Sequence, residues 1–539
     1  MKGQNNNKGT RGTQQRGGKP ANYPHKGKRR NPQCDPKSGE DPDLRSKTND
    51  PKWYAGNETL LRDAASIPFS EASGTPVLIK YSNQTWISPA GVMSLDILPT
   101  IGKSTNANSP INVAATAAYS WIRHANSGHA NYNSPDLMIY FMAMSSAYCY
   151  INFLQRCYGI ARLYTQRNRF FPKAVLQAAR VNADDITANL ANFRYGINVL
   201  ITKVASMAVP ANMSIFLRHA FLFQNLYMEG QSIKDNIYQF IPHAFYQFKL
   251  EEGEVPKGYL DIVTPRVNGA PWTNDDNGQL LAGTTELLRF GNQLLDPLIT
   301  SEDMNIMSGD ILKAYGSENL IKLAPLAEDY VVEPIFDPNV LLQIKNATVT
   351  QPNGYSPIKQ DETAGFLTQT ITISAQPDKT LWAANRILTI DAADPTPEQI
   401  VEATRLMAIY DTFTSPTAFL CGSDLCVGGY LTRVKTDASI GTLPFSSEYK
   451  VQLNTTAPVS DKVPALQCLG ILSDIRRFDY APYVHIQAYD GDTPKTSDPS
   501  TFCFDLDNYT SIDMNELRHL HEAALLNQLA VPAIAKVSG

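Results

Sequence analysis

The sequence LMIYFMAMSSAYCYINFLQ occupies residues 137–155 and contains no charged side chain. As a helix it is long enough to cross a bilayer. It nevertheless contains two serines, an asparagine and a glutamine, and its three tyrosines are spread along it. A membrane helix would concentrate its aromatic residues at the two interfaces. We therefore expect a buried core helix in a large, α-rich domain.

Helical patterns continue on both sides of this stretch. Ser134 is expected to cap the core helix, with Pro135 at its first position and an acidic residue in its first turn. Pro110 marks the start of the preceding helix. Downstream we expect one helix over about residues 183–208 and another from Ser214, closing at Gly230. Because these helices are apolar on most of their surface, we expect them inside the protein rather than on a sheet face.

The rest of the chain is more mixed. Strands are expected at residues 77–81, 368–374 and 483–489, where apolar residues alternate or cluster. Further helices are expected to begin near Thr285 and to run from Ser308 to Gly316.

Two helix-capping signals occur in the second half of the chain. Thr396 and Gln399 form a capping box that opens a helix expected to reach Tyr410. Asp513 and Glu516 form a similar pair before an apolar stripe of leucines and alanine. No repeat of 20–50 residues is present, which excludes a solenoid.

The N-terminal 34 residues, MKGQNNNKGTRGTQQRGGKPANYPHKGKRRNPQC, have a different character. They contain nine basic and no acidic residues, and almost nothing that could be buried. Such a segment cannot offset the entropy of ordering its backbone, so we expect a disordered basic arm. The candidate RNA-binding residues are Lys2, Lys8, Arg11, Arg16, Lys19, Lys26, Lys28, Arg29 and Arg30.

The charge of the whole chain conceals an asymmetry. The formal net charge is −5, from 47 basic and 52 acidic residues. Without the arm's nine positive charges the remaining residues carry −14. A polyanion should therefore meet the arm and not the acidic body. With Tyr23 as its one aromatic residue, the arm should bind RNA without sequence specificity.

The seven cysteines are few, odd in number and scattered, and no apolar signal segment begins the chain. We expect reduced thiols in an intracellular protein. Cys149 and Cys157 are expected to pack as small apolar residues in the core helix.

Motifs for catalysis or metal binding are weak. Residues 102–105, GKST, end like a phosphate-binding loop, but Ile97 stands where the motif needs glycine, so an ordinary polar turn is favoured. Residues 489–492, YDGD, are better explained by an Asp-Gly turn after a strand than by a two-metal site. The histidines and cysteines form no metal-binding pattern. We expect no catalytic residues, no metal and no cofactor.

A dense polar block, RHANSGHANY, occupies residues 123–132 between two apolar helices. An active site is one interpretation. We favour a loop that satisfies helix ends, or a contact between subunits, because polar groups between packed helices must find partners.

Three stretches resemble the capsid proteins of picobirnaviruses. They are NDPKWY at 49–54, AASIPF at 64–69 and SPINVAATAAYSWIRHANSGHANYNSPDLMIYFMAM at 109–144. The clear resemblance covers roughly residues 49–200. It implies a mainly α fold with minor β, unlike a jelly roll, and sixty dimers closing an icosahedral shell around double-stranded RNA. Some members cleave their own N-terminal segment, but no nucleophile–base pair for that reaction is evident here.

On this basis the chain is expected to have four parts. Residues 1–52 are the basic arm and a Pro-rich linker, 53–255 and 431–539 form the shell domain, and 256–430 form a projecting domain. The expected partners are further copies of the chain, viral RNA and, transiently, a membrane touched by residues 137–155 during entry. The expected location is the virion, after assembly in the host cytoplasm.

The resulting hypothesis is a structural capsid protein and not an enzyme. Two alternatives are a filament-forming RNA nucleoprotein and an RNA-processing enzyme with a basic tail. Electron microscopy separates them, because a capsid protein forms closed spheres and a nucleoprotein forms filaments.

Overall fold

The computed structural model describes most of the chain after residue 52. The described residues are 53–54, 56–69, 71–80, 82–126, 128, 132–163, 171–232, 234–252, 257–273, 279–352, 354–361, 363–373, 387–412, 417–454, 462–495, 501–503 and 508–530. Contacts divide the chain into two units, Met1–Phe69 and Ser70–Gly539. In the first unit, helix α1 (Glu58–Ala64) is capped by Asn57, whose side chain accepts a hydrogen bond from the Leu60 amide at 3.2 Å. No residue of α1 is buried.

The second unit contains the remaining helices and strands. The helices are α2 (Pro110–Ala125), α3 (Ser134–Arg162), α4 (Phe171–Ala178), α5 (Ala183–Ala188), α6 (Leu190–Val204), α7 (Ser214–Gln224), α8 (Thr284–Thr300), α9 (Glu302–Tyr315), α10 (Pro338–Lys345), α11 (Pro397–Ala403), α12 (Ala465–Ile475) and α13 (Met514–Gln528). The longer strands are β1 (Val77–Lys80), β2 (Thr85–Ile87), β3 (Ala90–Pro99), β5 (Ile237–Pro242), β6 (Phe245–Leu250), β7 (Gly258–Val263), β17 (Asp424–Val434), β18 (Ile440–Phe445), β19 (Glu448–Gln452) and β21 (Val484–Asp490). The shorter strands are β4 (Tyr227–Met228), β8 (Arg266–Val267), β9 (Ala270–Pro271), β10 (Gly354–Tyr355), β11 (Lys359–Gln360), β12 (Leu367–Thr368), β13 (Ile371–Thr372), β14 (Ile387–Thr389), β15 (Ile409–Tyr410), β16 (Phe419–Leu420), β20 (Val463–Pro464), β22 (Thr493–Pro494), β23 (Thr501–Cys503) and β24 (Tyr509–Ser511).

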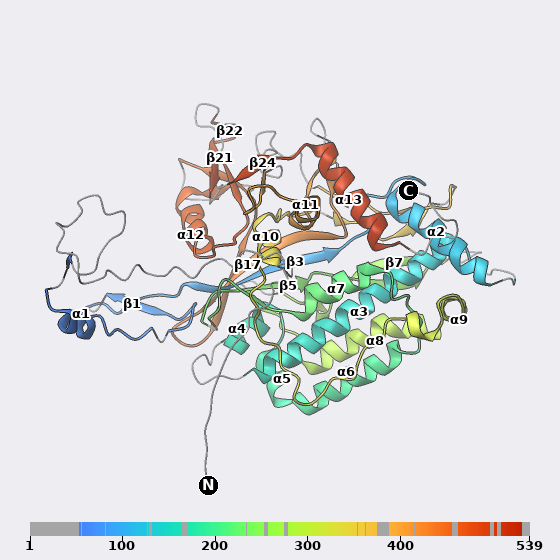
Figure 1. Cartoon of the computed structure of the whole chain (residues 1–539), viewed down its shortest axis with the longest axis horizontal. Helices are drawn as coiled ribbons and strands as arrows, with labels where there is room; N and C mark the ends of the chain where they lie inside the picture. The colour runs from blue at the N-terminus through green and yellow to red at the C-terminus, as the bar shows by residue number, and fades with distance from the viewer. Residues whose placement is uncertain are drawn as a thin grey trace, which may run out of the picture. The chain divides into compact units, whose positions relative to one another are not determined.

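A five-stranded sheet joins distant parts of the chain. Its order is β18-β17-β3-β5-β4, with β3 and β5 parallel and the other neighbours antiparallel. Every residue of β3 is buried, so both faces of this strand are covered. In Figure 1 helices α3, α5, α6 and α8 lie together on one side of these strands, and α12, α13 and β21 lie on the other.

Helix α3 is the centre of the helical layer. All its residues from Leu137 to Ile160 are buried, and it contacts α2, α4, α6, α7 and α8. It is the one helix among the described residues that is long and apolar enough to cross a membrane, and its most apolar window lies wholly inside the protein. The prediction of a buried core helix is therefore confirmed. The expectation that it avoids sheet faces is wrong in part, because β6 also packs along it.

The cap of α3 lies one residue earlier than predicted. The Asn133 side chain accepts from the Asp136 amide at 3.0 Å, and the Asp136 carboxylate accepts from the Asn133 amide at 3.0 Å. The predicted Ser134 is instead the first helical residue. Pro110, in contrast, begins α2 as expected.

Several predicted boundaries are wrong because tertiary contacts override local pattern. Residues 183–208 form two helices, α5 and α6. Helix α9 begins after Ser301, and Ser308 lies inside it, where its hydroxyl accepts a hydrogen bond from the Ala208 amide at 2.8 Å. Helix α7 ends at Gln224, so Gly230 does not close it.

The capping boxes are confirmed, but one helix is shorter than expected. Thr396 and Gln399 open α11, and Asp513 and Glu516 open α13. Helix α11 stops at Ala403, because Ile409 and Tyr410 pair with β16 instead. The strands expected near residues 77 and 484 are present as β1 and β21.

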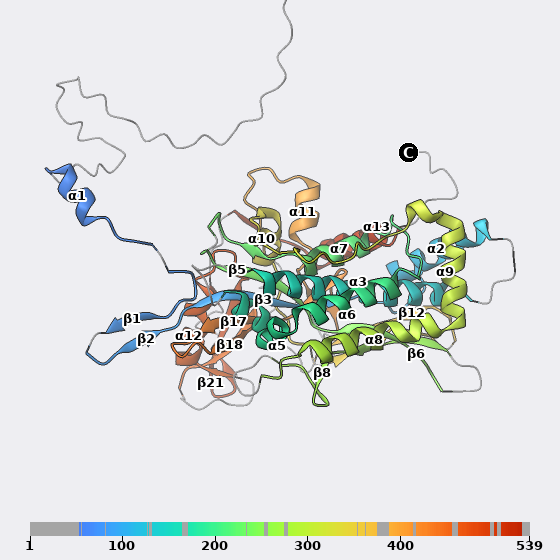
Figure 2. The same ribbon diagram turned by 90° about the horizontal axis from the view of Figure 1, so that it is seen from below.

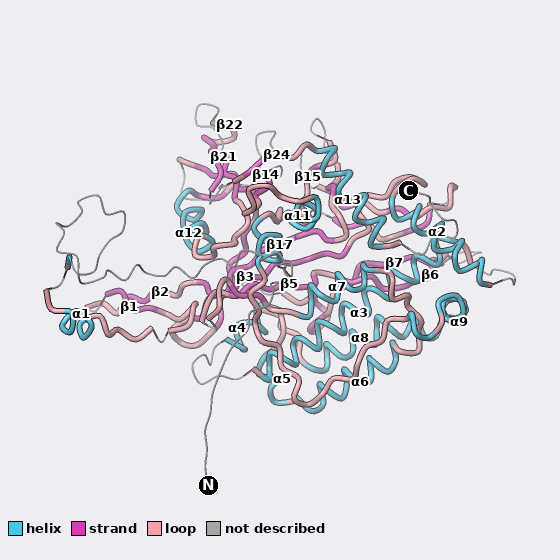
Figure 3. Tube along the Cα trace, viewed as in Figure 1, coloured by secondary structure: helices cyan, strands magenta, loops and turns pink. Residues whose placement is uncertain are grey.

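The β content is larger than the predicted minor share. Residues 368–374 contribute to two short strands in different sheets, β12 and β13. A second sheet has the order β20-β19-β21-β22, with β23 also pairing with β21. In Figure 3 strands β21 and β22 lie near α12, apart from the helices around α3, and Figure 2 shows β21 near α12 from below. Neither five-stranded sheet is wholly antiparallel, so the described residues do not form a jelly roll.

Candidate functional site

The second unit begins with a segment that crosses β3 at close range. The Ser73 amide donates to the carbonyl of Lys234 at 2.8 Å, and Gly74 has a φ of +87°. A Cβ at Gly91 would lie 2.6 Å from the Ser73 carbonyl oxygen and 2.8 Å from the Gly74 Cα. Glycine is therefore required where the two backbones meet.

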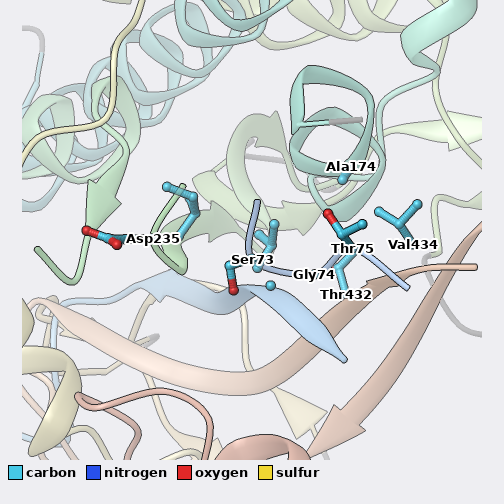
Figure 4. A pocket seen from close by; sticks show the side chains of 10 residues that line it. Ser73, Gly74, Thr75, Ala174, Asp235, Thr432 and Val434 are labelled. Atoms are coloured by element: carbon cyan, nitrogen blue, oxygen red, sulfur yellow. The ribbon is translucent and has the colours of Figure 1, made fainter. Parts of the chain in front are cut away.

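This crossing is buried against the central sheet. Figure 4 shows Ser73, Gly74 and Thr75 beside Asp235 and Thr432 around a small cavity of about 20 Å³. After this crossing the chain forms the β1–β2 hairpin.

The β1–β2 hairpin is apolar on both faces and exposed on both. Val77 pairs with Ile87, and Leu78 pairs with Trp86, so each face carries a cross-strand pair of apolar side chains. Val77, Trp86 and Ile87 are each about half exposed, at 49%, 48% and 50%. Figures 1 and 2 show the hairpin extending away from the central sheet.

A two-stranded hairpin is marginally stable in water by itself. Its unpaired edges are templates for pairing with another chain. Because both faces of this hairpin carry apolar side chains, with a polar pair only at Lys80 and Thr85, one layer of its own domain could cover only one of them. The β1–β2 hairpin is therefore a candidate surface for contact with another molecule.

The polar block at residues 123–132 meets α9 at a single carboxylate. Tyr132 donates its hydroxyl hydrogen to Asp310 Oδ2 at 2.8 Å, and Arg123 lies 3.4 Å from the same oxygen. Asn126 donates to the Asp310 carbonyl at 3.1 Å and to the Ile122 carbonyl at 2.8 Å. Burial and Asp310 together raise the pKa of Tyr132. The described residues of the block thus satisfy the end of α2, as one of the two favoured interpretations predicts.

Three residues that the sequence did not bring together form a buried cluster. Ser145 of α3 lies 3.0 Å from His219 Nδ1 of α7, and His219 Nε2 lies 3.2 Å from Asp424 Oδ1 of β17. Arg218 donates to Asp424 Oδ2 at 3.0 Å and to the Gln343 side chain at 2.9 Å. Serine, histidine and aspartate in this order suggest nucleophilic catalysis.

The charge states exclude that chemistry. Burial lowers the pKa of His219, but Cys149 and Asp424 outweigh it and raise this pKa to about 10. Burial alone would raise the pKa of Asp424, yet Arg218 and His219 hold it well below its usual range. At neutral pH the imidazole is therefore already protonated and cannot accept the Ser145 proton. The cluster is also inaccessible, since Ser145, His219 and Asp424 are each at most 3% exposed.

Sequence reasoning missed this cluster because its members are far apart in the chain. Its one local signal is the charged Asp424 at the start of a largely buried strand. The cluster connects α3, α7 and the central sheet, and its role in this structure is to hold them together.

The remaining motifs have structural explanations, as predicted. Lys103 of the GKST turn lies 2.7 Å from Asp411 Oδ2. Asp490 and Asp492 flank Gly491, with a φ of +60°, at the turn between β21 and β22. Asp492 lies 2.9 Å from Lys462 Nζ, and Asp490 lies 3.3 Å from Lys495 Nζ, so each carboxylate forms an ion pair with a lysine.

No group of three or more metal-binding side chains occurs among the described residues. Cys149 and Cys157 are buried in α3, and burial raises the pKa of the Cys157 thiol to about 12. His521 is buried against the Met407 carbonyl at 3.0 Å, whereas His519 is exposed. The six described cysteines are all free thiols.

The predicted RNA-binding residues lie outside the described part of the chain. They are Lys2, Lys8, Arg11, Arg16, Lys19, Lys26, Lys28, Arg29 and Arg30. Their role stays a prediction.

Comparison with known proteins agrees with the resemblance seen in the sequence. A family model described as "Picobirnavirus, Capsid protein" matches residues 53–426. A capsid protein precursor of Human picobirnavirus (strain Human/Thailand/Hy005102/-) is 28% identical over 526 residues, covering 90% of this chain and 92% of that protein. The X-ray crystallographic structure of the picobirnavirus capsid matches with a TM-score of 0.72 and 22% identity, covering 91% of this chain and 100% of that one.

Proposed function

This chain belongs to the picobirnavirus capsid protein family, and on that premise we propose that it assembles as homodimers into a closed icosahedral shell around double-stranded RNA. The protein is a structural component of the virion. Its assembly from dimers, the icosahedral geometry of the shell and the enclosed double-stranded RNA are our proposals. A symmetric dimer is the simplest unit from which a closed shell can be built.

The β1–β2 hairpin is the observation that carries the assembly proposal. Its two apolar faces and free edges are exposed in the single chain, and a second copy of the same chain is the partner that a shell always supplies. Pairing there would bury Trp86 and its neighbours and add main-chain hydrogen bonds.

Trp86→Lys tests this proposal. The new charge would sit within the proposed contact, so the variant should yield dissociated subunits where the unaltered protein yields closed particles. Negative-stain microscopy and size-exclusion chromatography measure the outcome. Asn83→Lys is the matched control, because it adds the same charge at the exposed turn of the same hairpin. Closed particles from Trp86→Lys in normal yield would remove the hairpin from the assembly contact.

We propose that the arm binds the genome without sequence specificity through its nine basic residues. If all nine pair with phosphates of a duplex, the slope of log affinity against log salt should be about −8. One arm binds weakly, but a closed shell gathers many arms at high local concentration.

Deletion of residues 2–34 tests the role of the arm. The shells should still form but contain little RNA, as measured by the absorbance ratio of purified particles and by RNA extraction. Shells that contain as much RNA as the unaltered ones would refute the role of the arm while leaving the assembly proposal intact.

The projecting domain also stays a proposal, placed within residues 256–430. Helix α8 packs against α3 and α6, so residues 284–300 belong to the same helical layer as the shell part. A projection would therefore be built from the rest of this range. Assembly in the host cytoplasm is likewise proposed. A membrane contact by residues 137–155 would require α3 to leave the protein interior, and liposome leakage by disassembled protein tests it.

A further inference from the structure

A cavity of about 360 Å³ opens between the end of α6, helix α9 and the segment that follows α9. This volume lies within the range of about 300–1,000 Å³ that is usual for small-molecule sites. The apolar part of the wall consists chiefly of Met207, Leu312, Leu320, Ile321 and Leu323. Leu312 is 46% exposed, so an apolar ligand in the cavity would cover surface that water now contacts.

Gly309 leaves part of this cavity open. It lies in the middle of α9 and belongs to the cavity wall. A Cβ at this position would meet no atom within 4 Å. Glycine is unfavourable inside a helix because it loses more backbone entropy on folding than alanine does. No close packing requires a glycine here, and its missing side chain leaves room that a ligand can occupy.

Several polar side chains in the wall already donate their hydrogens within the protein. Asn305 donates to the carbonyls of Ile299 and Ser301 at 2.7 and 2.8 Å. Ser206 donates its hydroxyl hydrogen to the carbonyl of Lys203 at 2.7 Å. These groups are therefore not the ones that would recognise a charged ligand.

Lys322 is the one charged side chain among the described residues that line the cavity. It is exposed to solvent, so it lies at the opening of the cavity. Its ammonium group forms no ion pair or hydrogen bond with any residue that the structure describes. An apolar cavity with a single unpaired cation at its opening suits an anion that carries an apolar chain.

We propose that this cavity binds a free fatty acid, which is a single alkyl chain ending in a carboxylate. The alkyl chain lies against the apolar wall and over Gly309, and the carboxylate pairs with Lys322. One chain is proposed because the volume is near the lower end of the usual range for ligand sites. A membrane phospholipid would bring a second acyl chain as well.

Calorimetric titration of the full-length protein with decanoate, below the concentration at which it forms micelles, tests the chemistry of the ligand. Dodecanoate should bind on the order of tenfold more tightly than decanoate, since each buried methylene contributes roughly a factor of four. Lys322→Gln should weaken decanoate binding about threefold to fivefold, as expected for one exposed ion pair. The same variant should leave binding of decan-1-ol, which has no charge, unchanged.

Lys313→Gln is the matched control for the lysine. Lys313 is exposed on the same helix, α9, but is not among the residues that line the cavity. It should therefore leave decanoate binding unchanged. Equal weakening by the two lysine variants would mean that the anion responds to overall charge and not to Lys322, and this would overturn the proposal.

Gly309→Leu tests the place of binding. The new side chain should fill the cavity from α9 and weaken decanoate binding at least on the order of tenfold. Gly470→Leu is the matched control, because Gly470 also lies within a helix and a Cβ there also meets no atom within 4 Å. Leucine is favoured over glycine in helices, so both variants should fold, as circular dichroism checks.

Three further outcomes would overturn the proposal. Equal decanoate binding to the two glycine variants would place the ligand elsewhere on the protein. Binding to vesicles of anionic phospholipid, without binding of free decanoate, would assign the cavity to a membrane lipid. Loss of closed particles in Gly309→Leu, with no decanoate bound by the unaltered protein, would assign the cavity to a contact between copies of the chain.

Discussion

Replacing Asp424 by asparagine should destabilise the protein strongly. The substitution keeps the size of the side chain but removes the negative charge that faces Arg218 and His219 in the buried cluster. Both of these cations would remain inside the protein without a counter-charge. Removing one partner of a buried ion pair typically costs about 3–5 kcal/mol in the free energy of unfolding.

The structure supports a value in that range. Asp424 Oδ2 accepts hydrogen bonds from Arg218 at 3.0 Å and from the Ser423 hydroxyl at 3.1 Å, and its other oxygen faces His219. A neutral amide could accept only on its oxygen and would direct its hydrogens toward a cation. Arg405 adds to the effect, because it is buried nearby and interacts electrostatically with both Arg218 and Asp424.

The same cluster gives stability a defined pH dependence. The pKa of His219 is raised to about 10 in the folded protein, from about 6.5 when unfolded, so its contribution is complete below pH 6.5 and is lost as the pH rises toward 10. The pKa of Asp424 is lowered, so its contribution is present above about pH 4 and is lost at more acidic pH. In Asp424→Asn the alkaline loss should shrink but not vanish, since Cys149 also raises the pKa of His219.

Urea unfolding followed by circular dichroism measures these effects at pH 5.5 and pH 9. Asp296→Asn is the matched control, because Asp296 forms an ion pair with Lys203 at 2.8 Å while its side chain is 55% exposed. An exposed pair contributes at most about 1 kcal/mol. If both variants lost the same free energy of unfolding at pH 5.5, the cluster would not hold the domain together.

Three further substitutions test the crossing at Gly91, the polar block at residues 123–132 and helix α13. Gly91→Ala should lower the free energy of unfolding by about 1–3 kcal/mol, because the new Cβ would displace the crossing segment. Limited proteolysis should then cut near residue 74 faster than in the unaltered protein. Gly470→Ala is the control and should leave the cleavage rate unchanged, because a Cβ there on α12 meets open space. Asp310→Asn should lower the urea midpoint by replacing the carboxyl group that Tyr132 and Arg123 share, at a cost of about 1–3 kcal/mol in the free energy of unfolding. An unchanged midpoint would contradict this role. Burial and Arg405 lower the pKa of His521 to about 3, so its contribution to stability should fade as the pH drops from about 6.5 toward 3; His521→Gln should flatten that acid limb.

The helices were largely predictable because their signals are local. A capping box needs only a side chain and an amide three residues apart, as Asp513 and Glu516 show. The apolar, uncharged composition of residues 137–155 also predicted that this helix is buried, because exposing so much apolar surface to water is unfavourable. Where a prediction was wrong, as at the end of α11, pairing with β16 had placed Ile409 and Tyr410 in a strand.

The sites were less predictable because they depend on contacts between distant residues. Nothing near Ser145 in the sequence indicates that His219 and Asp424 will surround it. The short, mostly apolar run at residues 77–81 predicted a strand, but not that both faces of β1 would stay exposed. Whether an apolar side chain is buried depends on what the rest of the fold places against it.

The sequence alone therefore determined the core helix, the charge asymmetry and the membership of a capsid family. These follow from composition and from interactions within a few residues. The tertiary structure alone decided that the serine, histidine and aspartate are a closed structural cluster, that Gly74 meets Gly91, and that the β1–β2 hairpin lacks a cover. Charge states and exposure are properties of an environment, and in this protein that environment joins segments as far apart in the sequence as Ser145 and Asp424.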